Sequence, residues 1–149
     1  MLALATLFFS GILVGLELCA HYGFHAPTLA LDEKSQIIFR QGVVRRLRWL
    51  VPAFFAPAAL CGIALAVVGG TGPGFIFRCA AIAAILVWII VRAIGTVPIN
   101  AATLNWDPNN PPTDWKRQIE KAERFHIVGT WAALVALVCF LASLFMGLQ

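Results

Sequence analysis

The chain alternates between long apolar runs and short polar connectors. The four apolar runs are Leu2–Ala20, Trp49–Gly69, Phe75–Ile94 and Ile127–Leu148. A helix rises about 1.5 Å per residue, so roughly 20 residues cross a hydrocarbon core of roughly 30 Å, and each run has about that length. The runs are continuous rather than alternating, which excludes a membrane β-barrel. The pattern predicts an all-α fold: a four-transmembrane-helix bundle forming a single membrane domain over residues 1–149.

Composition and charge extend this prediction to orientation. The chain is 60% hydrophobic and 12% charged, with a net charge of +4, whereas soluble domains are about a quarter charged. Most positive residues lie in two connectors, Lys34–Arg48 and Lys116–Arg124. The positive-inside rule then predicts two long cytoplasmic loops and N- and C-termini outside. The basic residues fit contact with membrane lipid, no nucleic-acid partner is predicted, and the expected location is the bacterial inner membrane.

The connectors carry helix and turn signals of their own. Asp32–Arg48 has the pattern of a short interfacial helix, whose arginines, including Arg40, would reach the lipid headgroups. Pro27 and Pro98 are expected to end the first and third helices. The glycine-rich stretch Gly69–Gly74 predicts a tight external turn. The charged segment before the last run contains no helix breaker, so we expect both to form one helix.

Polar groups inside or beside the apolar runs are the candidate functional residues. Glu17 lies within the first run, where a charged group costs roughly 2.5–3.5 kcal/mol on insertion scales, so a function is the default hypothesis. His21 and His25 follow it at helical spacing. Asn100 follows the third run and His126 immediately precedes the fourth. All lie toward the same end of the predicted bundle, so we expect them to converge on one cytoplasm-facing pocket.

The long second connector supplies further candidates for binding a substrate. These are Trp106, Asn105, Trp115 and Asp107. Each also has a structural interpretation, because Asn and Asp beside a proline can build Asx turns and tryptophans are common at the membrane interface. Glu17 could likewise serve only to tie helices together, by accepting a hydrogen bond from His21 or Asn100.

One segment, together with a short motif that follows it, resembles the sequence pattern of a known family. The run GTVPINAATLNWDPNNPPTDW, followed by ERFH at the start of the last apolar helix, resembles the anthrone oxygenase-like integral membrane family over essentially the whole chain. The resemblance implies a four-helix membrane bundle that oxidises an anthrone to an anthraquinone with O2. It points to Asn100, Trp106 and His126, and less strongly to Trp115. The family pattern has an arginine three residues after the histidine, where this chain has Gly129.

Such an oxidation has a chemical logic that needs no cofactor. An anthrone has an acidic C–H group whose carbanion reacts directly with O2, so the essential protein group is a base. Histidine titrates nearest to physiological pH, so His126 would take the proton. Asn100 would donate a hydrogen bond to the enolate oxygen, and Glu17 and His21 would orient the base. The partners are then an apolar small-molecule substrate and O2.

Two other functions fit the same residues. A single transition metal ion, Fe, Cu or Zn, could be held by Glu17, His21, His25 and His126, because the i, i+4 spacing lets two of them reach one metal. Alternatively, the protein is not a catalyst and uses its polar loop to bind lipid or a partner protein.

Overall fold

The computed structural model describes residues 1–147, and every regular element in that range is helical. In chain order the elements are α1 (Leu2–Leu18), the π-helix η1 (Cys19–Gly23), α2 (His25–Leu29), α3 (Glu33–Gly69), α4 (Phe75–Val91), the π-helix η2 (Arg92–Thr96), α5 (Val97–Thr103) and α6 (Trp115–Met146). The all-α prediction is confirmed for these residues.

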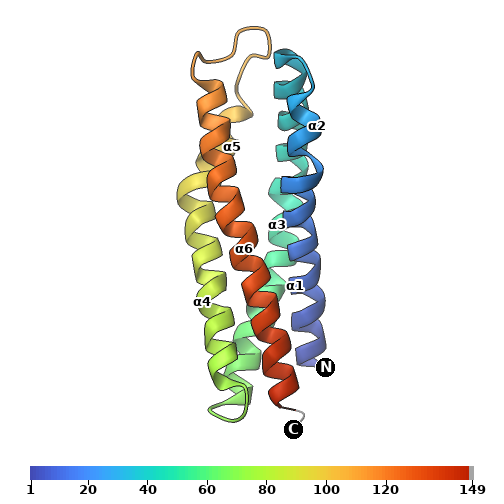
Figure 1. Ribbon diagram of the computed structural model, residues 1–149, viewed down its shortest axis with the longest axis vertical. Coiled ribbons are helices and arrows are strands. Elements are labelled where there is room, and N and C mark those ends of the chain that lie inside the picture. The colour runs from blue at the N-terminus through green and yellow to red at the C-terminus, as the bar shows by residue number, and fades with distance from the viewer. Residues whose placement is uncertain (148–149) are drawn as a thin grey trace.

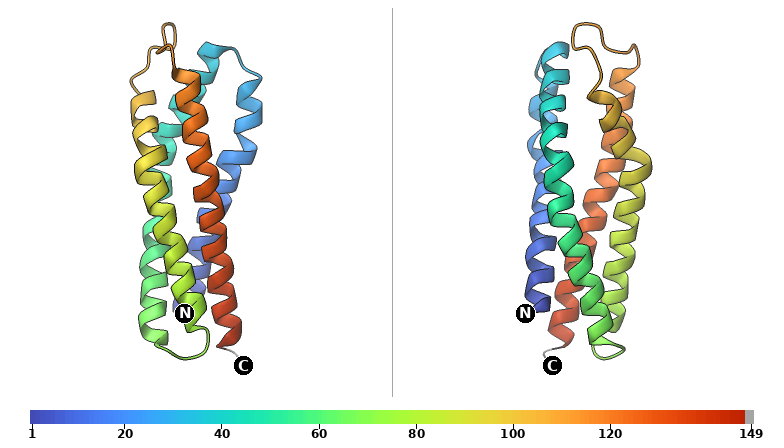
Figure 2. Two further views of the ribbon diagram at one scale, coloured as in Figure 1. Left: turned by 60° about the vertical axis from the view of Figure 1, so that its left-hand side comes forward. Right: turned by 180° about the vertical axis from the view of Figure 1, so that it is seen from behind.

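The elements join into four long helical rods that stand side by side (Figures 1 and 2). The stretches long and apolar enough to cross a membrane are Leu2–Leu29, Glu33–Gly69, Phe75–Thr103 and Trp115–Met146. They suggest an integral membrane protein and confirm the four predicted helices. The turn between α3 and α4 lies at the same end as both termini, here called the terminal end. The opposite end carries residues 104–114 and is called the loop end.

The segment Asp32–Arg48 is not a separate interfacial helix, and that prediction was wrong. It forms the first part of α3, a single helix of 37 residues, about 55 Å long at 1.5 Å per residue. Asp32 begins the helix by accepting a hydrogen bond from the Ser35 backbone N–H at 3.0 Å. Hydrogen bonds from the side chain and backbone of Ser35 keep the pKa of Asp32 below its usual range. Ile37 and Val44 are buried, so the apolar face packs into the bundle instead of lying on lipid.

Neither Pro27 nor Pro98 ends its helix, contrary to prediction. Pro27 lies inside α2, which continues to Leu29. Pro98 lies in the first turn of α5 and directly follows the π-helical turn η2, where the regular i→i−4 hydrogen bonding of the rod is already interrupted. The third rod therefore continues to Thr103. As a result Asn100 is on a helix, in a defined register with the residues before it, and not in a loop.

Small residues let the helices approach closely at two levels of the bundle. Towards the terminal end, alanines of α4 and α6 surround Phe140, and a Cβ added to Gly62 would lie 2.5 Å from the Phe140 ring. Towards the loop end, a Cβ added to Gly95 would overlap the ring of Phe125. Glycine at position 95 thus brings η2 against α6, in the way that small residues bring membrane helices together.

A buried arginine closes the terminal end. Arg78 is only 5% exposed. Its guanidinium donates to the carbonyls of Gly69 at 3.0 Å, Gly70 at 2.9 Å and Pro73 at 2.9 Å, and to the Ser143 hydroxyl at 3.2 Å. These bonds satisfy carbonyls at the end of α3, which have no partners within the helix. The predicted tight turn between the second and third rods is confirmed.

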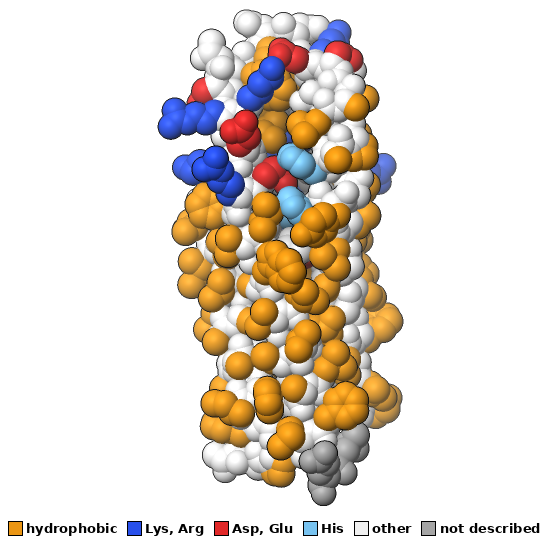
Figure 3. Space-filling model, in the orientation of Figure 1, with side chains coloured by type: hydrophobic (Ala, Val, Ile, Leu, Met, Phe, Trp, Pro, Cys, Tyr) orange, Lys and Arg blue, Asp and Glu red, His pale blue; other side chains and the backbone are white. Residues whose placement is uncertain are grey.

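Side-chain chemistry changes along the bundle axis. Figure 3 shows hydrophobic side chains over most of one face, with Lys, Arg, Asp, Glu and His side chains gathered toward the loop end. Large apolar side chains such as Phe8, Leu60 and Val67 are well exposed on the rods. An apolar outer surface with polar groups at one end is the arrangement expected of helices that cross a lipid bilayer.

Candidate functional site

Glu17 is the centre of a buried polar cluster between the rods. It is only 2% exposed. One carboxylate oxygen, Oε1, accepts from Trp88 Nε1 at 3.2 Å. The other, Oε2, forms an ion pair with Arg92 Nη2 and accepts from the Thr130 hydroxyl at 3.4 Å. The charge on Arg92 and these hydrogen bonds offset the desolvation of a carboxylate at this depth. Glu17 thus joins α1 to α4, η2 and α6.

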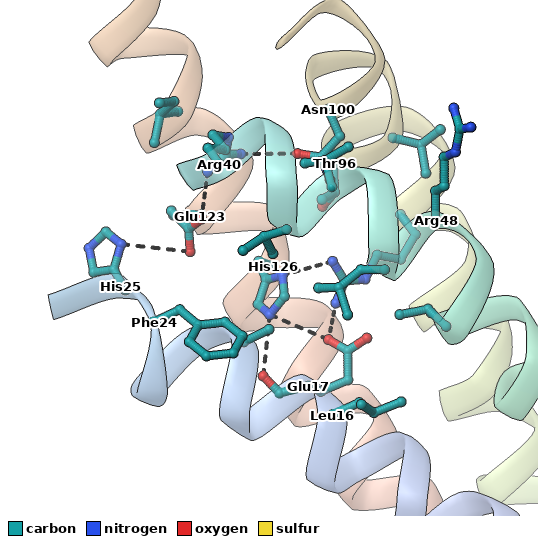
Figure 4. Close-up of a pocket in the computed structure, with 18 of the residues that line it drawn as sticks. Leu16, Glu17, Phe24, His25, Arg40, Arg48, Thr96, Asn100, Glu123 and His126 are labelled. Atoms are coloured by element: carbon teal, nitrogen blue, oxygen red, sulfur yellow. Dashed lines mark hydrogen bonds and ion pairs between the residues drawn. The ribbon is translucent and has the colours of Figure 1, made fainter. Parts of the chain in front are cut away.

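His126 lies directly beside this ion pair (Figure 4). Its Nδ1 is 2.8 Å from Arg92 Nη1, and arginine can only donate. Nδ1 is therefore the acceptor, and in the neutral ring the proton is on Nε2. Nε2 lies 3.3 Å from the Glu17 carbonyl and 3.5 Å from its carboxylate. Arg92 and Glu17 together set the tautomer and the orientation of the imidazole.

Two glycines make room for this contact. Gly95 lets η2 pack against Phe125, one residue before the histidine on α6. A Cβ added to Gly129 would lie 3.3 Å from Arg92 Nε, so the guanidinium occupies space beside a residue without a side chain. Arg92 itself lies in the π-helical turn η2. Such turns shift the helical register and are frequent at functional sites.

A second polar cluster lies nearer the loop end. Arg40 donates to Glu123 at 3.2 Å and to the Asn100 carbonyl oxygen at 3.0 Å. Glu123 Oε2 lies 3.4 Å from His21 Nδ1 and 4.0 Å from His25 Nδ1. This cluster links α3, α5, α6 and the end of the first rod. The prediction that Arg40 reaches outward to headgroups was wrong, because its guanidinium points inward to Glu123 and Asn100 (Figure 4).

An open cavity of about 680 Å³ adjoins both clusters. Its walls are mostly apolar and include Phe55 and Trp88, whose rings stack with centroids 4.4 Å apart. Its polar lining includes Glu17, His25, Arg40, Arg92, Thr96, Asn100, Glu123 and His126. A cavity of this size with few polar groups at defined places is typical of a site for a small apolar molecule.

The structure brings most of the predicted catalytic residues to one region. Glu17, Asn100 and His126 all line the cavity. His21 does not line it, but its ring stacks with that of His126 at a centroid distance of 5.9 Å and with that of His25 at 6.0 Å. Glu17 accepts no hydrogen bond from His21 or Asn100, because its carboxylate is held by Trp88, Arg92 and Thr130.

The four predicted substrate-contacting residues lie elsewhere, and none lines the cavity. Trp106 and Trp115 are buried in a small core with Ile37. Asp107 accepts from the Asn109 backbone N–H at 2.9 Å, which is an Asx turn. Asn105 is exposed. These residues therefore have structural roles: the two tryptophans pack against α3 through Ile37, and Asp107 shapes the turn of the loop.

Sequence reasoning missed several residues of the site, above all Arg92, Arg40 and Glu123. A signal existed for Glu123, because it precedes His126 by three residues and therefore shares its helix face. Arg92 lies near the end of the apolar run Phe75–Ile94, and an ionisable residue at that depth is a functional candidate by the same reasoning that selected Glu17. Arg40 carried no distinguishing signal among the other arginines of its segment.

The predicted metal ligands do not form a metal site in the part of the chain that the structure describes. No group of three or more His, Cys, Asp or Glu side chains within residues 1–147 is arranged to hold a metal ion. The Glu17 carboxylate forms an ion pair with Arg92, while the His21 and His25 rings face the Glu123 carboxylate. An arginine inserted among the proposed ligands is a poor neighbour for a cation. The residues present therefore do not fit the metal alternative.

Comparison of the chain with protein-family models, with curated proteins and with solved structures found no match.

Proposed function

We propose that the cavity is the active site of a membrane oxidoreductase that resembles the anthrone oxygenases. Its substrate would be an apolar aromatic or quinol-like molecule, and its oxidant O2. The observation that carries this proposal is an apolar cavity of about 680 Å³ with His126, Arg92 and Glu17 in its lining. An apolar wall suits the ring system, and the polar group offers a base beside a positive charge.

Arg92 controls when His126 can act as a base. In the structure the lone pair of Nδ1 already accepts from Arg92 Nη1. A substrate oxygen that accepts this hydrogen bond instead would leave Nδ1 free to take a proton from carbon. Arg92 would keep its ion pair with Glu17 through Nη2. The imidazolium would then lie beside the Glu17 carboxylate, 3.5 Å from Nε2, which stabilises its charge.

The same exchange stabilises the product of proton removal. Loss of the C–H proton turns the substrate ketone into an enolate, and its oxygen gains the negative charge that a guanidinium stabilises best in a dry site. In this scheme Arg92 takes the role that the sequence had suggested for Asn100. Asn100 lines the same cavity but holds Arg40 through its carbonyl oxygen.

The remaining steps balance without a cofactor. The carbanion donates electrons to O2, and a new C–O bond gives a hydroperoxide after uptake of the first proton. Loss of the second proton from the same carbon breaks the O–O bond, forms the carbonyl and releases water. One anthrone and one O2 thus give one anthraquinone and one water. The protein supplies the base, the positive charge and a water-poor cavity.

The test is anthrone oxidation by protein purified in detergent, followed by anthraquinone absorbance in air-saturated buffer. We expect acceleration over buffer and a loss of about 10²-fold or more in His126→Gln, since general base catalysis contributes roughly 10² to 10⁴. Lys121→Gln, an exposed position on the same helix, is the matched control and should keep its activity. No acceleration by the wild type, or equal activity of both variants, would contradict the proposal. Binding of the ring compound without turnover would instead favour the non-catalytic alternative.

A further inference from the structure

The cavity opens sideways, between α3 and the third rod. Among the cavity-lining residues that are exposed on these two helices are Arg48, Pro52, Ile89, Ala93 and Val97. Arg48 and Pro52 lie one turn apart on one face of α3, and the other three follow one face of the third rod at intervals of four residues. Each set forms one edge of the opening, here called the mouth. Both helices are long and apolar enough to cross a membrane, so in a bilayer the mouth would face lipid.

The mouth lies where the charged part of α3 meets its apolar part. Arg48 is the last charged residue before Trp49–Gly69, a stretch that contains none. Trp49 is 71% exposed, and the Arg48 guanidinium lies 5.3 Å from the centre of its ring. An exposed tryptophan beside an arginine at the end of an apolar stretch is typical of the level of the lipid headgroups. A molecule that enters here would keep its polar end at that level while its apolar part reaches the cavity.

Three arginines line the cavity, and two of them are paired with carboxylates. Arg92 pairs with Glu17, and Arg40 pairs with Glu123. Arg48 forms no ion pair with any residue of 1–147, and its side chain points away from both glutamates in Figure 4. With neutral histidines, three arginines and two glutamates leave the lining with one excess positive charge. That charge is located at the mouth.

The two helices that form the mouth have no carboxylate to neutralise this charge. Residues 34–106 contain all of α3 except its first residue and the whole third rod, and they include no Asp or Glu. They do include Arg45 and Arg46, which are exposed on α3 within one turn of Arg48. An anion at the mouth would therefore meet positive charge and no repulsion from α3 or the third rod.

We propose that the mouth binds the acidic group of an amphiphilic ligand through Arg48, while the apolar part of the same ligand lies along Phe55 and Trp88 inside the cavity. A carboxylate or phosphate can accept two hydrogen bonds from the planar guanidinium. The inference rests on the proposed function, because the cavity is the same. It specifies the substrate class further: a lipid-soluble ring compound with an acidic group. An anionic lipid offers the same chemistry, and the test distinguishes these two sources.

The test compares two probes of the same shape, anthracene-2-carboxylate and anthracene-2-carboxamide, which differ in charge. Neither has the acidic C–H group that the proposed reaction needs, so binding is measured without turnover. The full chain is placed in nanodiscs of phosphatidylcholine, and dissociation constants are obtained from energy transfer between tryptophan and anthracene. Nanodiscs without the protein correct for partition of each probe into lipid. We expect the wild type to prefer the carboxylate roughly three- to tenfold, because the pair is charge-assisted but partly exposed to solvent.

Arg48→Gln removes the charge and keeps a polar side chain. We expect the preference to fall to about one with an unchanged melting temperature, because Arg48 is exposed and has no ion pair to lose among residues 1–147. Arg46→Gln is the matched control, since it removes the same charge from an exposed position of α3 outside the cavity lining. It should keep most of the preference. No preference in the wild type, or an equal loss in both variants, would overturn the proposal.

A second set of nanodiscs, with added phosphatidylglycerol, identifies the source of the acidic group. The change in each dissociation constant is compared with that in Arg48→Gln, which reports the general repulsion of the probe by a charged bilayer. A preference that still depends on Arg48 would show that the mouth selects an acidic group on the ring compound. A preference abolished by phosphatidylglycerol in the wild type would show that an anionic lipid headgroup occupies the mouth.

The two proposals fail separately. A carboxylate preference that depends on Arg48, without any anthrone oxidation, would support the anion site and refute the catalytic proposal. Anthrone oxidation that depends on His126, without any preference for the carboxylate, would refute the anion site alone.

Discussion

Replacing Glu17 by alanine tests whether the buried ion pair holds the rods together. The side chain of Glu17 is 1% exposed and that of Arg92 13%, so neither charge can recover much hydration when its partner is removed. The substitution would also leave Trp88 Nε1 without its acceptor. Breaking a buried pair by removing one partner costs about 3–5 kcal/mol. We expect a decrease of that size in the free energy of unfolding.

The assay is titration of detergent-solubilised protein with sodium dodecyl sulfate, followed by circular dichroism. Glu33→Gln is the matched control, because Glu33 also pairs across the bundle, with Lys116 at 2.5 Å, but both side chains are more than half exposed. An exposed pair contributes about 0–1 kcal/mol. If Glu17→Ala lost no more stability than Glu33→Gln, the buried pair would not be a tertiary contact of consequence and the reasoning would be refuted.

A double variant separates the cost of an unpaired charge from the value of the pair. Replacing Glu17 by leucine and Arg92 by methionine removes both charges. Buried ion pairs can often be replaced by apolar residues without loss of stability. We therefore expect Glu17→Leu with Arg92→Met to be more stable than either single variant. A double variant as unstable as the sum of the two single ones would show that the residues do not interact.

Two further predictions concern the packing that positions the site. Gly95→Ala should lower the free energy of unfolding by about 1–3 kcal/mol, because the added Cβ would overlap the Phe125 ring. A second substitution in the same chain, Phe125→Leu, should recover part of this loss. If stability does not recover, the overlap with Phe125 is not the cause of the loss. Arg78→Met should lower the free energy of unfolding by about 2–3 kcal/mol, because it leaves the carbonyls of Gly69 and Gly70 without donors. The same titration measures this loss. A variant as stable as the wild type would contradict the capping role of Arg78.

The positions of the four rods could be predicted from the sequence because burial in lipid depends on the length and polarity of a segment, and both are local properties. The same holds for Glu17, whose charge stands out in an apolar run, and for the continuity of the last helix through the charged segment before it. Local signals failed at Pro27 and Pro98, since a proline near the start of a helical segment ends nothing.

The candidate site was only partly predictable. Glu17, Asn100 and His126 could be assigned to one end of the bundle from topology, and they do line one cavity. Their partners could not be assigned, because the sequence of an apolar helix does not state which way it is rotated about its axis. Arg40 could face headgroups or the bundle interior with equal local plausibility, and only packing against Glu123 and Asn100 decides between them.

By itself, then, the sequence determined that this chain forms four apolar helices with ionisable groups concentrated towards one end. The length and hydropathy of each segment and the positions of the charges can be read from the chain without knowing how the helices pack. Only the tertiary structure decided that Arg92 contacts both Glu17 and His126, that Trp106 and Trp115 fill a core, and that Arg40 turns inward to Glu123 and Asn100. These outcomes depend on helix rotation and close approach, which small residues such as Gly95 permit and which arise only when all four rods pack together.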